Sequence, residues 1–138
     1  AIQVLQHVLV GTADLLGRDP RHLGDDGLDF LDIDQALPGV HRHQALARAG
    51  WSVADVDRVE INEAFAAIAL SCLREIGFAE DVVNVEGGAI AHGHPIGASG
   101  AILSTRLMYS MKRDGLRRGI VTLCIGGGQG IALAIEML

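Results

Sequence analysis

The chain has 138 residues, a formal net charge of −6 and a hydrophobic content of 49%. This length fits one domain covering residues 1–138, and the hydrophobic content can fill a core, which excludes a disordered chain. The net negative charge argues against a basic nucleic-acid-binding surface. The apolar start is too short to span a membrane and lacks the basic residues of a signal peptide, so we expect a cytoplasmic protein without a membrane span. The two cysteines, Cys72 and Cys124, predict neither a disulfide framework nor a metal site.

Hydrophobic patterning predicts strands that alternate with helices along the chain. The expected strands are residues 4–13, 56–61, 82–85, 120–125 and 130–137, and the expected helices are residues 38–49, 62–76 and 99–113. The last two strands are close together and joined by glycines, which is typical of a hairpin. Residues 14–34 and 87–97 are expected to form loops, and the acidic run within 25–34 is expected to be a solvated surface. This order predicts an α/β domain with a mixed, mostly parallel five-stranded sheet and helices on both faces.

His94 is the first candidate for chemistry, because it precedes Pro95 and a predicted helix begins a few residues later. The positive end of a helix favours the neutral imidazole, which can take a proton from a thiol or donate a hydrogen bond to a carbonyl oxygen. A histidine that merely caps a loop is the alternative that this residue alone leaves open.

Cys124 is the second candidate, because it lies at the end of an apolar strand that runs into Gly126 and two further glycines. A thiol at a strand end is well placed to face a pocket, and its thiolate could abstract or return a proton. The glycines could direct backbone N–H groups at a developing oxyanion. The alternative is a small buried side chain beside a tight turn.

Asn62 is expected to be the N-cap of its helix, although its amide could also hold a water or a carbonyl group. Glu63 is either an acid of the first helical turn or a residue that orients the site. Cys72 lies inside an alanine-rich helix, where core packing is expected. His92 is expected to be a helper or a surface residue, rather than a second site histidine.

Three motifs occur in a fixed order: NEAF at residues 62–65, GHP at residues 93–95 and CIGGG at residues 124–128. Together they closely resemble the C-terminal domain of the thiolase family, which makes and breaks carbon–carbon bonds between acyl groups on coenzyme A. The resemblance is strong from about residue 56 to the end and is traceable from residue 4.

The resemblance implies a role for each matching residue. His94 would activate a nucleophilic cysteine for attack on an acyl thioester, and Asn62 would hold a water that forms one oxyanion hole together with His94. Cys124 would be the acid/base that shuttles a proton on the second substrate. The Gly126 N–H would contribute to the other oxyanion hole.

The resemblance also implies a composite enzyme, because thiolases pack two similar α/β halves together. The nucleophilic cysteine and most coenzyme A contacts come from the N-terminal half, for which this chain has no candidate. We therefore expect one half of an oligomeric acyltransferase of lipid and fatty acid metabolism, inactive by itself and without a permanently bound cofactor. Its substrates would be coenzyme A and acyl-CoA. The helix after residue 62 should then be apolar nearly all round, since the two halves would bury it.

The chain departs from the family pattern at three places: residues 24–39 are longer and more acidic, Ile102 stands where arginine is common, and His92 replaces an aliphatic residue. None of these touches the four matching positions. Two alternatives remain. A non-catalytic scaffold subunit has no need for Asn62, His94 and Cys124 together. A ketoacyl synthase generally has a second histidine where this chain has Cys124.

Overall fold

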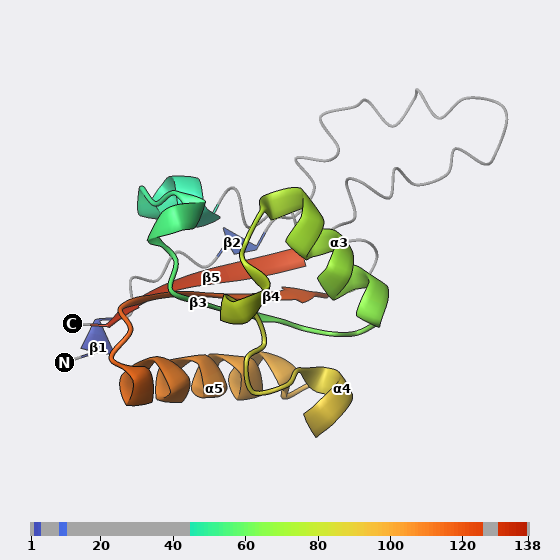
Figure 1. Ribbon diagram of the computed structural model, residues 1–138. Helices are drawn as coiled ribbons and strands as arrows, with labels where there is room; N and C mark the ends of the chain where they lie inside the picture. The colour runs from blue at the N-terminus through green and yellow to red at the C-terminus, as the bar shows by residue number, and fades with distance from the viewer. Residues whose placement is uncertain (1, 4–8, 11–44, 126–129, 138) are drawn as a thin grey trace, which may run out of the picture.

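The computed structural model describes residues 2–3, 9–10, 45–125 and 130–137. These residues form a mixed sheet with helices on both of its faces (Figure 1). The long strands of the described part are β3 (Arg58–Ile61), β4 (Arg118–Cys124) and β5 (Gly130–Met137). The two-residue strands β1 (Ile2–Gln3) and β2 (Leu9–Val10) both pair antiparallel with β5. The predicted α/β class is therefore confirmed.

The pairing of the strands differs in part from the predicted sheet. β4 and β5 form the expected antiparallel hairpin, in which Cys124 lies opposite Gly130, whereas β3 and β4 run parallel. A single further parallel bridge joins Val59 to Val83. The expectation of a mostly parallel sheet is thus wrong for the described residues, because β5 has only antiparallel partners among them.

The prediction of a strand at residues 82–85 is also wrong. Its place is taken by the 3-10 helix η4 (Glu80–Val82) and the bridge at Val83. The reason lies in the next residue, because Asn84 adopts a φ of 48° and turns the chain out of the extended conformation. The five-stranded sheet that the sequence predicts is therefore not formed as expected within the described residues.

The helices of the described part follow the sequence more closely. Residues 45–49 are helical and end at Gly50, as predicted, whereas residues 38–44 of that predicted helix lie outside the described residues. The helices α3 (Ala66–Ile76) and α5 (Ser99–Asp114) end at glycines in the left-handed conformation, Gly77 and Gly115. The four-residue helix α4 (Ala89–His92) lies in the predicted loop, and η3 (Val53–Asp55) precedes β3. In the described ranges, no helix has the length and apolar character needed to cross a membrane.

Asn62 is not the N-cap that the sequence predicts, because α3 begins four residues later, at Ala66, with Phe65 in the capping position. The backbone explains the delay. The Asn62 N–H donates a hydrogen bond to the carbonyl of Thr122 at 2.9 Å, which extends the parallel pairing of β3 with β4 by one residue. A residue engaged in the sheet in this way does not start a helix.

One face of the sheet packs against α5, which lies below the sheet in Figure 1. Leu103, Leu107 and Met111 of α5 are fully buried and cluster with two sheet residues, Val121 and Ile135. The close approach depends on Gly119 of β4, where an added Cβ would lie 2.5 Å from the Met111 sulfur. Full burial of a leucine or isoleucine side chain contributes about 1.5–3 kcal/mol to stability.

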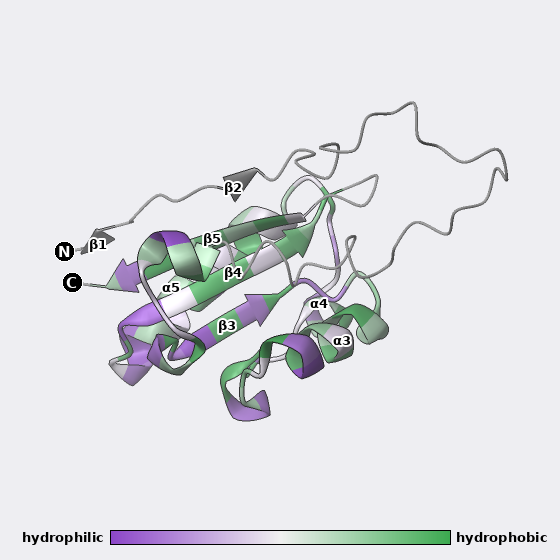
Figure 2. Cartoon of the chain, turned by 90° about the horizontal axis from the view of Figure 1, so that it is seen from above, coloured by the Kyte–Doolittle hydropathy of each residue, from purple (hydrophilic) through white to green (hydrophobic). Residues whose placement is uncertain are grey.

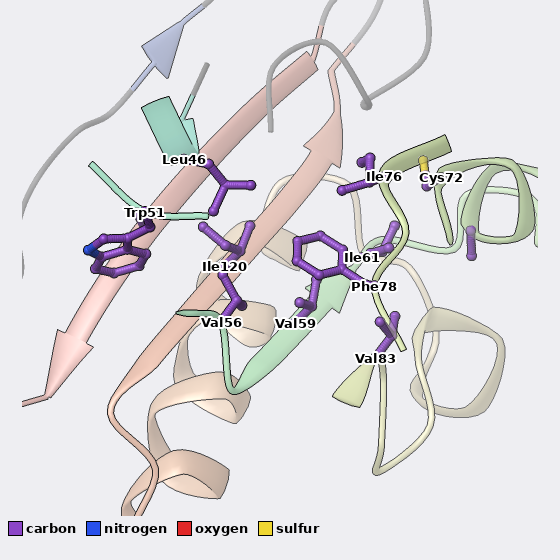
Figure 3. Close-up of a cluster of buried hydrophobic side chains, with 12 residues drawn as sticks. Leu46, Trp51, Val56, Val59, Ile61, Cys72, Ile76, Phe78, Val83 and Ile120 are labelled. Carbon is purple, nitrogen blue, oxygen red and sulfur yellow. The ribbon is translucent and has the colours of Figure 1, made fainter. Parts of the chain in front are cut away.

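The opposite face packs against α3 and the helical segment at residues 45–49. Ile120 and Ala134 point to this face, since they alternate along their strands with Val121 and Ile135. Figure 3 shows the resulting cluster, in which Ile120 lies near aromatic and aliphatic side chains. Its other labelled members are Leu46, Trp51, Val56, Val59, Ile61, Cys72, Ile76, Phe78 and Val83. The predicted core position of Cys72 is confirmed, since this side chain is fully buried.

Polar and apolar residues alternate along β3, as the hydropathy colours of Figure 2 show beside the mainly apolar β4. Val59 and Ile61 belong to the cluster under α3, so Arg58 and Glu60 point to the α5 face. This alternation fixes which residues of β3 reach each side of the sheet, and it leads the strand into Asn62 at the edge described next.

Candidate active site

The carboxyl ends of β3 and β4 meet at one edge of the sheet because these strands are parallel. Asn62 directly follows β3, and Cys124 is the last residue of β4. The hydrogen bond from the Asn62 N–H to Thr122 holds the two strand ends together. The carboxyl edge of parallel strands is where sites usually form in α/β folds.

The GHP segment brings His94 to this edge. Gly93 ends α4 with a φ of 88°, a conformation that favours glycine, and the chain then turns toward α5. The Asn62 amide nitrogen Nδ2 lies 3.3 Å from His94 Nε2, although these residues are 32 positions apart. The Asn62 side chain is almost fully buried, and its Oδ1 has no hydrogen-bond partner among the described residues.

Ser99 contacts the other ring nitrogen of His94. The Ser99 hydroxyl donates to the carbonyl of Pro95 at 3.0 Å, and its oxygen lies 2.6 Å from His94 Nδ1. A hydroxyl has one hydrogen to donate, so in this arrangement Oγ accepts from the Nδ1–H of His94. When the Ser99 hydrogen goes to Pro95, His94 carries its proton on Nδ1 and its lone pair on Nε2, which faces the amide nitrogen of Asn62.

A cavity of about 460 Å³ opens beside these residues, and both His94 and Cys124 line it. Much of its wall is apolar and comes from β4 and β5, through residues such as Leu123, Ile131 and Leu133. Gly100 and Ser104 of α5 also line it. A cavity of this kind suits a mainly apolar ligand group that lies against an imidazole and a thiol.

Glu63 is not an acid of the first helical turn, because α3 begins at Ala66. Its carboxylate accepts hydrogen bonds from the Asn84 side chain at 3.1 Å and from the Ile90 backbone N–H at 3.0 Å. The second sequence-based interpretation, a residue that orients the site, agrees with these contacts. His92 has no hydrogen-bond partner for either ring nitrogen among the described residues.

Sequence reasoning missed Ser99 and Asn84 as parts of this site. Each looks like a local feature in the sequence, since serine suits a helix start and asparagine suits a turn. Ser99 lies five residues after His94, which is the one sequence signal that could have pointed to their contact. Gly126, the fourth residue implied by the resemblance, lies outside the described residues.

The electrostatics of this region centre on Glu60, which is fully buried two residues before Asn62. Burial raises the pKa of Glu60 to about 7, and the positive charge of Arg106 opposes this rise. Neither carboxylate oxygen of Glu60 has a hydrogen-bond partner among the described residues. Within the same ranges, no three histidine, cysteine or carboxylate side chains gather in a group that could hold a metal ion.

Residues 22–137 match the family model described as "Thiolase, C-terminal domain". The acetyl-CoA acetyltransferase of Chromobacterium violaceum is 58% identical over 93 residues, which are 67% of this chain and 24% of that protein. The acetyl-CoA acetyltransferase of Thiocystis violacea is 58% identical over 110 residues, which are 77% of this chain and 28% of that protein. The cytosolic acetyl-CoA acetyltransferase of Rattus norvegicus is 52% identical over 93 residues, 67% of this chain and 23% of that protein. The chain thus spans about a quarter of the length of the curated relatives it matches.

Proposed function

The chain belongs to the thiolase family, whose C-terminal domain it matches, and we propose that it supplies the C-terminal half of a composite acyl-CoA C-acyltransferase site. This site would cleave a 3-oxoacyl-CoA with coenzyme A or, in reverse, condense two acyl-CoA thioesters. The observation that carries the proposal is the contact between Asn62 and His94 beside a cavity that Cys124 also lines. Coenzyme A and its thioesters are substrates in this reaction, and the site needs no permanently bound cofactor.

His94 acts as the base in the proposed mechanism. Its Nε2 lone pair takes the proton of a nucleophilic cysteine thiol, and the sulfur then attacks the carbonyl carbon of the acyl thioester. Ser99 supports this role because, when it accepts from Nδ1–H, the lone pair of the imidazole lies on Nε2. When the reaction returns the proton, the same nitrogen donates it.

Asn62 lies where it can stabilise negative charge next to His94. Its Nδ2 is a hydrogen-bond donor 3.3 Å from the imidazole, and its buried Oδ1 has no hydrogen-bond partner among the described residues. An oxyanion held by such a donor and by the imidazolium formed at His94 is stabilised in the transition state more than in the ground state. We assign Asn62 and His94 jointly to one oxyanion hole, with Gly126 contributing its N–H to the other.

Cys124 serves the second substrate. Its thiol lines the same cavity as His94, at the end of β4. In the cleavage direction the thiol gives its proton to the carbon that leaves after the carbon–carbon bond breaks. The resulting thiolate then accepts the proton of incoming coenzyme A, which restores the thiol and lets the coenzyme A sulfur attack the acyl-enzyme.

The nucleophilic cysteine belongs, in this proposal, to an N-terminal half that covers the site. Four large apolar side chains around the site are strongly exposed: Phe65 (73%), Ile90 (70%), Ile96 (83%) and Ile125 (53%). An apolar surface of this kind marks an interface. The start of α3 presents exposed apolar residues as expected, whereas its last turn exposes Arg74 and Glu75. The assembled enzyme is proposed to be an oligomer, and its proposed location is the cytoplasm, by analogy with the cytosolic acetyl-CoA acetyltransferase of the rat.

A non-catalytic scaffold subunit is the alternative function. The structure offers no specific support for it, because a scaffold requires neither the tautomer that Ser99 imposes on His94 nor the cavity beside Cys124. The deciding experiment is a thiolysis assay on this chain assembled with an N-terminal thiolase half, with 3-oxoacyl-CoA and coenzyme A as substrates. We expect turnover that His94→Ala and Cys124→Ala each reduce by at least about 10²-fold. Unchanged turnover in either variant would contradict the assigned role of that residue.

A further inference from the structure

Glu63 connects the two segments that carry Asn62 and His94. Its Oε1 accepts a hydrogen bond from Asn84 Nδ2 at 3.1 Å, and its Oε2 accepts one from the Ile90 N–H at 3.0 Å. Glu63 directly follows Asn62 in the chain, and Ile90 lies four residues before His94. One carboxylate therefore joins the NEAF segment to the helix that leads into the GHP segment.

Asn84 is itself fixed on the end of β3. Its Oδ1 accepts from the Ile61 N–H at 2.7 Å, its Nδ2 donates to the Ile61 carbonyl at 2.9 Å, and its backbone N–H donates to Val59 at 2.9 Å. The side chain thus pairs with Ile61 as a neighbouring strand residue would. Because Ile61 directly precedes Asn62, this pairing ties the loop at Asn84 to the strand end that carries the site asparagine.

Gly88 provides the room that the Glu63 carboxylate occupies. A Cβ at this position would lie 2.3 Å from the carboxyl carbon of Glu63 and 2.4 and 2.6 Å from its two oxygens. The backbone of Gly88, with φ −96° and ψ −155°, is open to residues other than glycine, so the requirement for glycine is steric. An alanine there would displace the carboxylate from Asn84 and Ile90.

Arg106 of α5 holds the same loop from the other side. Its Nη2 donates to the carbonyls of Glu86 at 3.0 Å and Gly87 at 2.8 Å. The loop between Asn84 and Gly88 is therefore bound to β3, to Glu63 and to α5. Among these contacts, the hydrogen bond between the Glu63 carboxylate and the Ile90 N–H joins the NEAF segment directly to α4.

We propose that Glu63 is a positioning residue that sets the separation between Asn62 and His94 in the acyl-transfer site. The inference rests on the proposed function, in which both residues stabilise the same oxyanion. Asn84 Nδ2 and the Ile90 N–H are both donors, so the position requires two acceptor oxygens. A carboxylate meets this requirement, whereas the amide of glutamine presents one acceptor and turns an NH2 group toward a donor.

The test compares Glu63→Gln and Gly88→Ala with a matched control, Gly97→Ala, in the assembled enzyme. At Gly97 an added Cβ has nothing within 4 Å. We expect Glu63→Gln and Gly88→Ala each to lower kcat about 10²-fold, because a misplacement of about 1 Å has an effect of this size. KM and the urea midpoint should change little, and Gly97→Ala should keep wild-type kcat. A fall in the urea midpoint with kcat unchanged would overturn the inference, because it would show a purely structural role.

A double variant separates positioning from general damage. Once Glu63→Ala has removed the carboxylate, the three atoms nearest to the Cβ of Gly88→Ala are gone, so the second substitution should add less than about a twofold further loss. Additive losses in the two variants would overturn the inference. A conservative change, Glu63→Asp, should restore part of kcat, because it keeps both acceptor oxygens on a shorter side chain.

A measurement on the 138-residue chain distinguishes a failure of this inference from a failure of the proposed function. Nitrogen-detected NMR of the His94 ring reports the contacts of Nε2 and Nδ1 without any substrate. We expect Glu63→Gln and Gly88→Ala to shift the Nε2 resonance, and Gly97→Ala to leave it in place. If the assembled wild type proves inactive, the proposed function fails. The NMR spectrum alone then decides whether Glu63 positions His94. An unmoved Nε2 resonance would then overturn the positioning role.

Discussion

His94 Nδ1 lies 2.6 Å from the hydroxyl oxygen of Ser99, so the imidazole contacts the first residue of α5. Ser99 is fully buried and donates its own hydrogen to Pro95, so it accepts from the imidazole. The contact places the imidazole lone pair on Nε2, on the side of Asn62. In the proposed mechanism, a serine at the start of α5 thereby orients a base that lies outside the helix.

Ser99→Ala should therefore lower turnover without unfolding the chain. Loss of the acceptor for Nδ1–H leaves the imidazole free to rotate and to change tautomer, and we expect kcat in the assembled enzyme to fall about 10–100-fold. KM should change less, because Ser99 does not line the cavity. Steady-state thiolysis kinetics check this. Ser110→Ala is the control, since the Ser110 hydroxyl donates within its own helix to Leu107 and does not line the cavity. Equal losses in both variants would contradict the role of Ser99.

The pH dependence of stability should report on Glu60. Burial raises the pKa of this carboxyl from 4.5 to about 7, with Arg106 opposing the rise. The native chain then binds more protons than the unfolded chain between these values, so the free energy of unfolding declines as pH rises from about 4.5 to 7. A shift of this size corresponds to about 3 kcal/mol.

Glu60→Gln removes the ionisation and should abolish this decline. Urea unfolding at pH 5 and pH 8 provides the comparison. We expect the free energy of unfolding of Glu60→Gln, relative to that of the wild type, to be higher at pH 8 than at pH 5. Glu75→Gln, at an exposed position of α3, should follow the wild-type pH dependence. An identical pH dependence in wild type and Glu60→Gln would show that the buried carboxyl does not titrate as expected.

The parts of the fold that the sequence predicted well have strong periodic patterns and clear stops. The limits predicted for β5 match the structure at both ends, and α5 extends one residue further than predicted, to Asp114, where Gly115 ends it. These features are local, because apolar periodicity and a left-handed glycine act within a few residues.

The errors occur where a contact distant in the sequence overrides a local rule. Asn62 has the residue type of an N-cap, but its N–H is taken by Thr122, 60 positions away. The segment after η4 has strand-like residues, but Asn84 leaves the extended conformation in order to pair with Ile61. Neither partner is visible in the local pattern, so propensity alone gives the wrong boundary.

In the candidate site, too, local motifs were predicted from the sequence, whereas contacts between distant segments were not. The motifs and the family resemblance named Asn62, His94 and Cys124, and the structure brings these residues to one edge of the sheet. Ser99 was not recognised as a support, and an orienting role for Glu63 was one of two interpretations, because the contacts of both residues depend on distances between loops. The space left by Gly88 for that carboxylate is likewise a property of the folded chain.

Gly119→Ala tests the packing of α5 against the sheet. An added Cβ would lie 2.5 Å from the Met111 sulfur and 2.9 Å from a methyl carbon of Leu107, both on fully buried side chains. Overpacking of this kind costs about 1–3 kcal/mol, so we expect the urea midpoint to fall. Combining it with Met111→Ala should cost less than the sum of the two single changes, because the second change removes the closest contact. An undisturbed midpoint in Gly119→Ala would contradict the tight packing.

Asn62 offers the sharpest test of the proposed chemistry, because two substitutions separate the effect of its side-chain size from the effect of its Nδ2 donor. Asn62→Asp keeps the size of the side chain but replaces the Nδ2 donor with a carboxylate oxygen next to His94. A negative charge there would repel the oxyanion and favour an imidazolium, which cannot act as a base. We expect kcat to fall about 10²–10³-fold in Asn62→Asp and in Asn62→Ala, as for removal of an oxyanion-hole donor. If Asn62→Asp retained wild-type turnover, the donor would be dispensable, and the hydrogen bond between Nδ2 and His94 would serve the fold alone.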